Sequence, residues 1–108
     1  MKTIVIILLI VLTFTLHPPA LAADTANGAK IFSVQCAGCH INGGNIVRRG
    51  KTLKLKALKR NQMDSQDAIA TLVANGKNNM SAYKDRLSPK EIEDVATYVL
   101  EQAEKGWR

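Results

Sequence analysis

Cys36-Ala37-Gly38-Cys39-His40 is the stretch of sequence that decides the fold. The pattern C-x-x-C-H is the attachment signature of a c-type haem. Cys36, Cys39 and His40 stand at positions i, i+3 and i+4, so one helical turn places all three side chains on one face. A single porphyrin can then meet both sulfurs and the imidazole. The motif therefore predicts one covalent haem c per chain, and with it electron transfer or haem-ligand chemistry.

The first 22 residues are typical of a secretory signal peptide. Lys2 supplies the positive charge, residues 4–16 form an almost unbroken apolar run, and Ala20-Leu21-Ala22 is an A-x-A cleavage site. An uncleaved membrane anchor is the alternative, but the apolar run is shorter than the roughly 18 residues that span a bilayer. We expect a cleaved signal peptide over 1–22, one domain over 23–108, and no stable membrane insertion after cleavage.

Cleavage would remove His17 and leave His40 as the single histidine of the mature chain. Both cysteines would lie within the same five residues as that histidine. The thiols of exported cysteines are normally oxidised unless they are protected or have already reacted. Thioether bonds to a haem would be such a reaction. A domain this small also needs reinforcement beyond its modest apolar core, which a covalent haem provides.

Two other chemistries use a C-x-x-C pair. A structural zinc site needs four ligands, and the mature chain offers three cysteine and histidine side chains with no second pair. A thiol–disulfide oxidoreductase motif accompanies a βαβ pattern, and the sequence has no strand pattern. A colourless, correctly matured protein would favour the second of these alternatives.

The periodicity of the mature chain is helical, and it predicts an all-α fold of about four helices around one haem. The first helix is expected over about residues 25–38, and a short second helix is expected after Thr52 as its cap. Ser65 is a typical N-cap of the third helix, which should end at Asn75-Gly76.

The last helix is the best-marked element of the sequence. Ser88 is a typical N-cap, Pro89 occupies the first helical position, and Glu91 completes a capping box. The helix should end near Glu104. Its apolar side chains recur at i, i+3, i+4, i+7 and i+8 and predict one buried stripe, formed by Ile92, Val95, Ala96, Val99 and Leu100.

An iron bound to His40 needs a sixth ligand, and the candidates are Met63, Met80, a lysine or water. Methionine opposite histidine is common in haem electron carriers and raises the reduction potential. Met63 directly precedes the third helix and is expected to pack. Met80 lies in an irregular loop over residues 77–87, which can fold over the far face of a haem, so the residues favour Met80.

The chain carries a net charge of +6 and a basic cluster within residues 48–60. Such a cluster is usually a solvated face, and the alternative is a docking patch for an acidic redox partner. Nucleic acid is not expected as a partner, because no aromatic side chains are interleaved with the charges. The members of the basic cluster are Arg48, Arg49, Lys51, Lys54, Lys56, Lys59 and Arg60.

Several further segments carry a resemblance to a known family. They are Asn27-Gly28-Ala29-Lys30-Ile31-Phe32, Asn45-Ile46-Val47, Lys51-Thr52-Leu53, Asn75-Gly76-Lys77-Asn78-Asn79-Met80, Arg86-Leu87-Ser88, Ile92-Glu93-Asp94-Val95-Ala96-Thr97-Tyr98-Val99-Leu100 and Gln102-Ala103-Glu104-Lys105-Gly106-Trp107. With the C-x-x-C-H motif, they make the chain resemble cytochrome c6 (soluble cytochrome f, a class I c-type cytochrome) over about residues 24–107.

The resemblance implies a class I cytochrome c fold with Cys36 and Cys39 as haem thioethers, His40 as proximal ligand and Met80 as distal ligand. It implies a monomeric one-electron carrier that is not an enzyme, moving electrons from the cytochrome b6-f complex to photosystem I in the thylakoid lumen. A periplasmic location, with a respiratory terminal oxidase as acceptor, is the alternative. It also implies that the first helix packs its Gly28 and Phe32 against Tyr98.

The chain departs from the family pattern at two places. Ser81 follows Met80 where the family usually has proline, which would leave that loop less rigid. Arg48-Arg49 stands where the family often has an apolar residue and proline, next to the expected haem edge. These departures keep two alternatives open, a haem-based ligand sensor with a labile sixth position and a specialised c6-like paralogue.

Overall fold

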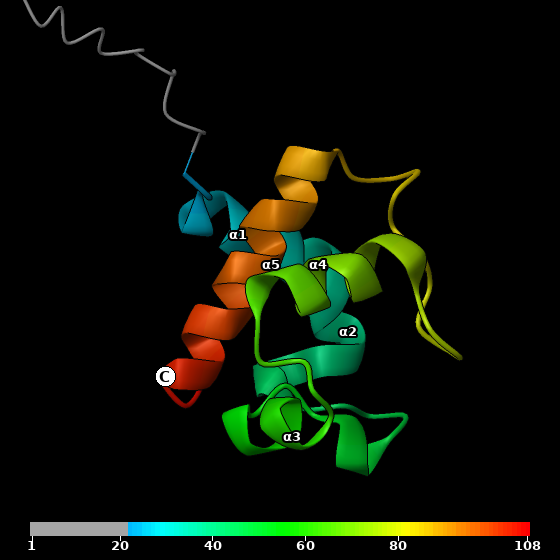
Figure 1. Cartoon of the computed structure of the whole chain (residues 1–108), viewed down its shortest axis with the longest axis vertical. Coiled ribbons are helices and arrows are strands. Elements are labelled where there is room, and N and C mark those ends of the chain that lie inside the picture. Colours follow the sequence, from blue (N-terminus) through cyan, green and yellow to red (C-terminus); the bar gives the residue numbers. More distant parts are fainter. Residues whose placement is uncertain (1–21) are drawn as a thin grey trace, which may run out of the picture.

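The computed structural model describes residues 22–108, which fold into helices joined by loops (Figure 1). These residues contain no strand beyond an isolated bridge between Lys77 and Met80. The all-α prediction is therefore confirmed. His17 and all but the last residue of the expected signal peptide lie outside the described residues. None of the described helices is long and apolar enough to cross a membrane.

The cysteine motif lies at the end of a long helical arm. The arm consists of α1 (Thr25–Ile31), a π-helical turn (Phe32–Cys36) and α2 (Ala37–His40), which follow one another directly. It extends two residues beyond the predicted end at residue 38. The wider π-helical turn was not predicted, and such turns are frequent at functional sites.

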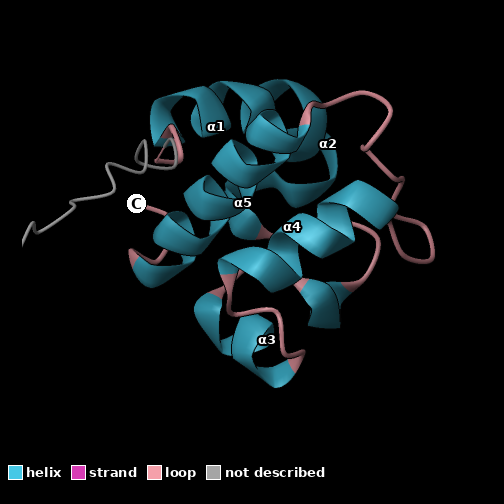
Figure 2. Cartoon of the chain, turned by 45° about the horizontal axis from the view of Figure 1, so that its top comes forward, coloured by secondary structure: helices cyan, strands magenta, loops and turns pink. Residues whose placement is uncertain are grey.

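The rest of the chain adds three α-helices and two short 3₁₀ turns. The 3₁₀ turns are Ile41–Gly43 and Arg49–Lys51, and the helices are α3 (Leu55–Arg60), α4 (Gln66–Asn75) and α5 (Pro89–Glu104). With the arm counted as one helix, the predicted four-helix architecture is observed. Figure 2 shows α3 at one end of the molecule and the arm at the other, with α4 and α5 between them.

The predicted caps of α4 and α5 are present. Ser65 accepts a hydrogen bond from the backbone N–H of Ala68 (3.1 Å). Ser88 accepts one from the backbone N–H of Glu91 (3.1 Å), and the Glu91 carboxylate accepts the N–H of Ser88 in return (3.0 Å). Each cap satisfies amide donors that the first helical turn leaves without a partner.

The predicted cap of α3 at Thr52 is wrong. The helix begins at Leu55, with Lys54 at the N-cap and no side-chain cap. The reason lies in long-range hydrogen bonds of Leu53, whose N–H donates to the carbonyl of Gly43 (2.7 Å) and whose carbonyl accepts from Trp107 (2.9 Å). These bonds hold the chain extended through Lys54 and so delay the start of the helix.

The arm packs against α5 through a close backbone approach. A Cβ atom on Gly28 would lie 2.8 Å from the Cβ of Tyr98 and would also overlap the backbone of Asp94, so only glycine fits. The Phe32 ring lies beside that of Tyr98, with their centroids 5.5 Å apart. This packing, which the resemblance implied, is confirmed, and it holds the arm against α5.

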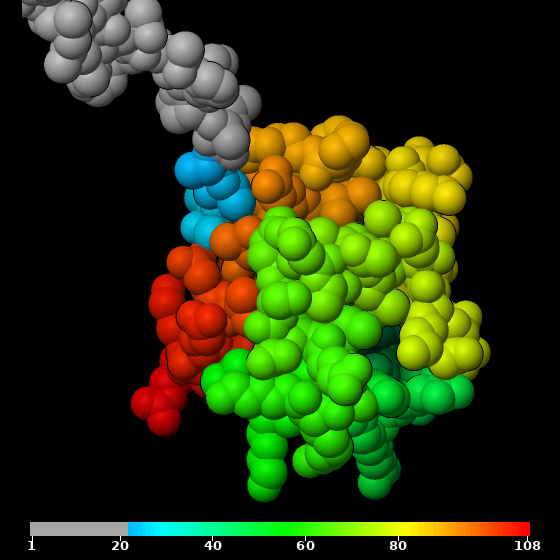
Figure 3. All heavy atoms as spheres, in the orientation of Figure 1, coloured from blue at the N-terminus to red at the C-terminus, as the bar shows by residue number. Residues whose placement is uncertain are grey.

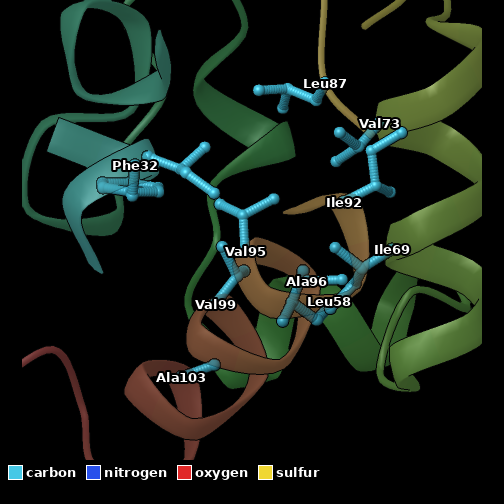
Figure 4. Packing of buried hydrophobic residues seen from close by; sticks show 11 residues of the cluster. Phe32, Leu58, Ile69, Val73, Leu87, Ile92, Val95, Ala96, Val99 and Ala103 are labelled. Atoms are coloured by element: carbon cyan, nitrogen blue, oxygen red, sulfur yellow. The ribbon is translucent and has the colours of Figure 1, made fainter. Parts of the chain in front are cut away.

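The hydrophobic core forms where α5 meets the arm, α3 and α4 (Figure 4). The predicted stripe of α5 is buried apart from Leu100, which is half-buried. Removing a valine, leucine, isoleucine or phenylalanine side chain from water supplies about 2 kcal/mol, and such burial dominates the stability of a small domain. The buried core residues are Ile31, Phe32, Leu58, Ile69, Val73, Leu87, Ile92, Val95, Ala96, Val99 and Ala103.

Candidate haem site

The predicted site residues meet at one cavity of about 420 Å³. Cys36, Cys39 and His40 line it from the helical arm, and Met80 lines it from the loop between α4 and α5. Figure 3 shows the molecule hollowed between this loop and the residues that follow the arm. Core residues also line the cavity and give it an apolar floor. They are Phe32, Leu58, Ile69, Val73, Val95 and Val99. The volume lies in the usual range of cofactor sites, about 300–1,000 Å³.

The two cysteine side chains are unpaired thiols at the cavity wall. Cys36 is half-buried and Cys39 is exposed. Burial raises the pKa of the Cys36 thiol to about 11. Reactive redox cysteines have a lowered pKa, because the thiolate is the nucleophile. The environment of Cys36 thus counts against a thiol oxidoreductase and suits a sulfur bonded to an apolar ring.

The imidazole of His40 is oriented by its own loop. Its Nδ1 atom lies 2.8 Å from the carbonyl oxygen of Gly44. A carbonyl only accepts, so the proton of the neutral ring is on Nδ1 and the lone pair of Nε2 is free. Two backbone hydrogen bonds hold this loop in turn. The N–H of Gly44 donates to the carbonyl of Ile41 (2.9 Å), and the N–H of Ile46 donates to the carbonyl of Cys39 (3.0 Å). A metal-binding histidine is commonly oriented by such a bond from its other ring nitrogen.

Met80 is held by the backbone of its loop. Lys77 and Met80 exchange two backbone hydrogen bonds of 3.0 Å each. Further along, the N–H of Tyr83 donates to Val73 (2.9 Å) and that of Lys84 to Ala74 (3.2 Å), which attaches the loop to the end of α4. The Met80 side chain is half-buried and packs against the core.

Met63 packs against the core, as predicted, but it also lines the cavity. Its backbone N–H donates to the carbonyl of Leu58 (2.7 Å), which fixes the connection between α3 and α4. Both methionines therefore reach the same space, a result that their positions in the sequence did not predict.

Tyr83 and Gln35 line the cavity, and the sequence analysis named neither of them. The hydroxyl of Tyr83 donates to the backbone carbonyl of Gln35 (3.1 Å), 48 residues away. Desolvation by burial raises the pKa of Tyr83, so this hydroxyl stays protonated and remains a donor at neutral pH. No local sequence signal marks this contact, because its two partners are brought together by the fold alone.

The mouth of the cavity is basic. Arg48, Lys51 and Lys77 line it with their side chains exposed to solvent. All seven members of the basic cluster, to which Lys77 does not belong, are exposed, as predicted for a solvated or docking face. Exposed apolar side chains lie next to the cluster in the chain, with Ile46 67 % and Val47 54 % exposed.

The donor set fits a haem c. Two thiols, an imidazole with a free nitrogen and a thioether sulfur line an apolar cavity, and cationic side chains at its mouth can offset the carboxylates of a haem. Residues 22–108 contain no cluster of three or more cysteine, histidine, aspartate or glutamate side chains placed to hold a metal ion.

Comparison with known proteins points to the same chemistry. The family described as "Cytochrome C oxidase, cbb3-type, subunit III" matches residues 23–99. A cytochrome c6-like protein of Nostoc sp. is 66 % identical over 105 residues, which cover 97 % of this chain and 95 % of that protein. A cytochrome c6 of the same strain is 54 % identical over 96 residues, which cover 89 % and 86 % of the two chains.

A solved structure is also similar. The crystal structure of cytochrome c6C from a Synechococcus species superposes with a TM-score of 0.72 at 58 % sequence identity. The superposition covers 73 % of this chain and 96 % of that chain.

Proposed function

Because the chain belongs to the cytochrome c6 family, whose members carry covalent haem c, we propose that Cys36 and Cys39 attach the haem and that His40 and Met80 ligate its iron. The observation that supports this most is the cavity into which all four side chains converge. When bound, a haem c supplies a one-electron couple, and the chain is a c6-type electron carrier rather than a catalyst.

The residues of the cavity tune such a carrier in three ways. His40 offers the free Nε2 atom of a ring that Gly44 holds in place. The soft thioether of Met80 favours the reduced metal and so raises the potential. The apolar floor would exclude water from the bound group and so lower the local dielectric around it.

We further propose that the mature carrier is a monomer over residues 23–108 that takes electrons from the cytochrome b6-f complex to photosystem I in the thylakoid lumen. The family match begins at residue 23, directly after the signal peptide expected over residues 1–22, and this supports export. The exposed basic cluster supports docking to an acidic partner. A periplasmic carrier that reduces a terminal oxidase would use the same surface.

A specialised c6-like paralogue is the second candidate. The identity to the c6-like protein of Nostoc sp. is 66 %, against 54 % to a cytochrome c6 of the same strain. Ser81 after Met80 and the Arg48-Arg49 pair also depart from the family pattern. Such a paralogue would keep the haem chemistry and differ in potential or partner.

The test is to mix the ferrous holoprotein with photosystem I particles and to follow re-reduction of the oxidised primary donor after a laser flash. The proposal expects a rate that rises with protein concentration and falls as salt screens the basic cluster. Turnover of a terminal oxidase without reduction of photosystem I would assign the respiratory role. Failure with both acceptors would favour the specialised paralogue, and rapid carbon monoxide binding to the untreated ferrous protein would favour the sensor.

A further inference from the structure

The loop that carries Met80 is attached to the rest of the protein very unevenly. Its backbone hydrogen bonds run within the loop or to Val73 and Ala74 at the end of α4. Within residues 22–108, a single hydrogen bond joins residues 77–87 to the arm that carries the cysteines. That bond runs from the hydroxyl of Tyr83 to the carbonyl of Gln35.

This bond crosses from one segment of the cavity wall to another. Tyr83 follows Met80 by three residues, and Gln35 directly precedes Cys36. Both line the cavity, so the hydroxyl connects the thioether side of the site to the thiol side. The Tyr83 ring is held in turn by its backbone bond to Val73 and by the guanidinium of Arg86, which lies 5.2 Å from the ring centroid.

The loop needs such a restraint because its backbone is not stiffened by proline. Ser81 follows Met80, and the next proline is Pro89, at the start of α5. Serine leaves φ free at the position next to the sulfur-bearing residue, whereas proline would fix it. A tether from the loop to the arm restricts the same motion from the side-chain end.

We propose that Tyr83 is a positioning residue whose hydroxyl, by bonding to Gln35 across the cavity, holds the Met80 loop closed over the sixth coordination position of the iron. The proposal rests on the proposed function, in which Met80 is the distal ligand. It assigns the role to the hydroxyl alone, since the aromatic ring would pack equally well in phenylalanine.

The test compares the ferric holoproteins of wild type, Tyr83→Phe and Tyr98→Phe. The last variant is the matched control, because Tyr98 lies in the packing of the arm against α5 and not in the loop. We expect Tyr83→Phe to raise the affinity for added imidazole about five-fold, the change that follows from losing one hydrogen bond of ordinary net strength. The ferrous variant should also bind carbon monoxide faster, and Tyr98→Phe should change neither property.

Urea unfolding of the three holoproteins separates positioning from stability. An unchanged imidazole affinity in Tyr83→Phe, with the methionine-to-iron charge-transfer band of wild type intact, would overturn the tether and leave the proposed function standing. An equal rise in both variants would assign the effect to general destabilisation and would also overturn it. Absence of that band from the wild type would overturn the tether and the proposed role of Met80 together.

Discussion

The indole nitrogen of Trp107 donates to the carbonyl oxygen of Leu53 over 2.9 Å, which fastens the C-terminal turn to the segment that leads into α3. The N–H of Leu53 donates to Gly43, and the next residue, Gly44, accepts from the ring of His40. The C-terminal tryptophan is thus joined by consecutive hydrogen-bonded segments to the loop that orients the expected proximal ligand.

Replacing Gly43 by alanine should destabilise the holoprotein by at least about 2 kcal/mol. Gly43 has φ +76°, and a Cβ atom there would overlap the ring of Trp107. The left-handed backbone and the steric overlap both add to the cost. Urea unfolding measures it, with Gly50→Ala as the control, because a Cβ at Gly50 meets no atom within 4 Å. Equal stabilities of the two variants would contradict this packing.

Met80→Ala should abolish the methionine-to-iron charge-transfer band, lower the midpoint potential and open the iron to carbon monoxide, because the soft axial sulfur is lost. Met63→Ala is the matched control, since Met63 also lines the cavity and packs against the core. We expect it to keep the band and to lose about 2 kcal/mol of stability through a packing defect. The reverse pattern would assign the ligand to Met63.

The buried carboxylate of Asp94 should make stability depend on pH. Burial by itself raises the pKa of Asp94, but hydrogen bonds from Lys90, from Asn27 (3.0 Å) and from the backbone of Asp24 (2.8 Å) bring it below its ordinary value. A lowered folded-state pKa stabilises the protein above the unfolded-state pKa of about 3.9, and that contribution is lost as the pH falls through the folded-state value.

The free energy of unfolding of wild type should therefore fall between about pH 5 and pH 2, and Asp94→Asn should flatten that dependence. At pH 7 the variant should be less stable by about 2 kcal/mol, because the donors lose a charged acceptor. Glu93→Gln, at the exposed neighbouring position, is the control for a change of net charge. An acid dependence that survives Asp94→Asn unchanged would place its origin elsewhere.

Charge reversal at Arg48 and Arg49 should slow reduction of photosystem I about ten-fold at low salt and weaken its salt dependence. Both side chains are exposed, and Arg48 reaches the mouth of the cavity. Reversal of the exposed Lys30 and Lys105, both outside the basic cluster, changes the net charge by the same amount and serves as the control, which should have a smaller effect. Equal losses in the two proteins would show that net charge, and not this face, governs the encounter.

The elements that sequence predicted well are those whose signals are local. The capping box of Ser88 and Glu91 spans four residues and is present. The cap at Thr52 failed because Leu53 is bound by Gly43 and Trp107, which are distant in the chain. The same physical reason hid the bond between Tyr83 and Gln35.

The candidate site could be predicted as far as its chemistry is local. The C-x-x-C-H motif brings its three side chains to one cavity, as its helical spacing predicts. The sixth ligand could not be predicted with the same certainty of position, because both Met63 and Met80 reach the cavity. Only the position of Met80 in the loop between α4 and α5 favours Met80 as that ligand.

The measurement that tests the central claim most directly is a potentiometric titration of the mature holoprotein. Ligation of the haem iron by His40 and Met80 in a c6-type carrier predicts a strongly positive midpoint potential, because the thioether favours the ferrous state. A midpoint near or below zero would contradict Met80 as a firm ligand, and with it the role of a carrier between the cytochrome b6-f complex and photosystem I.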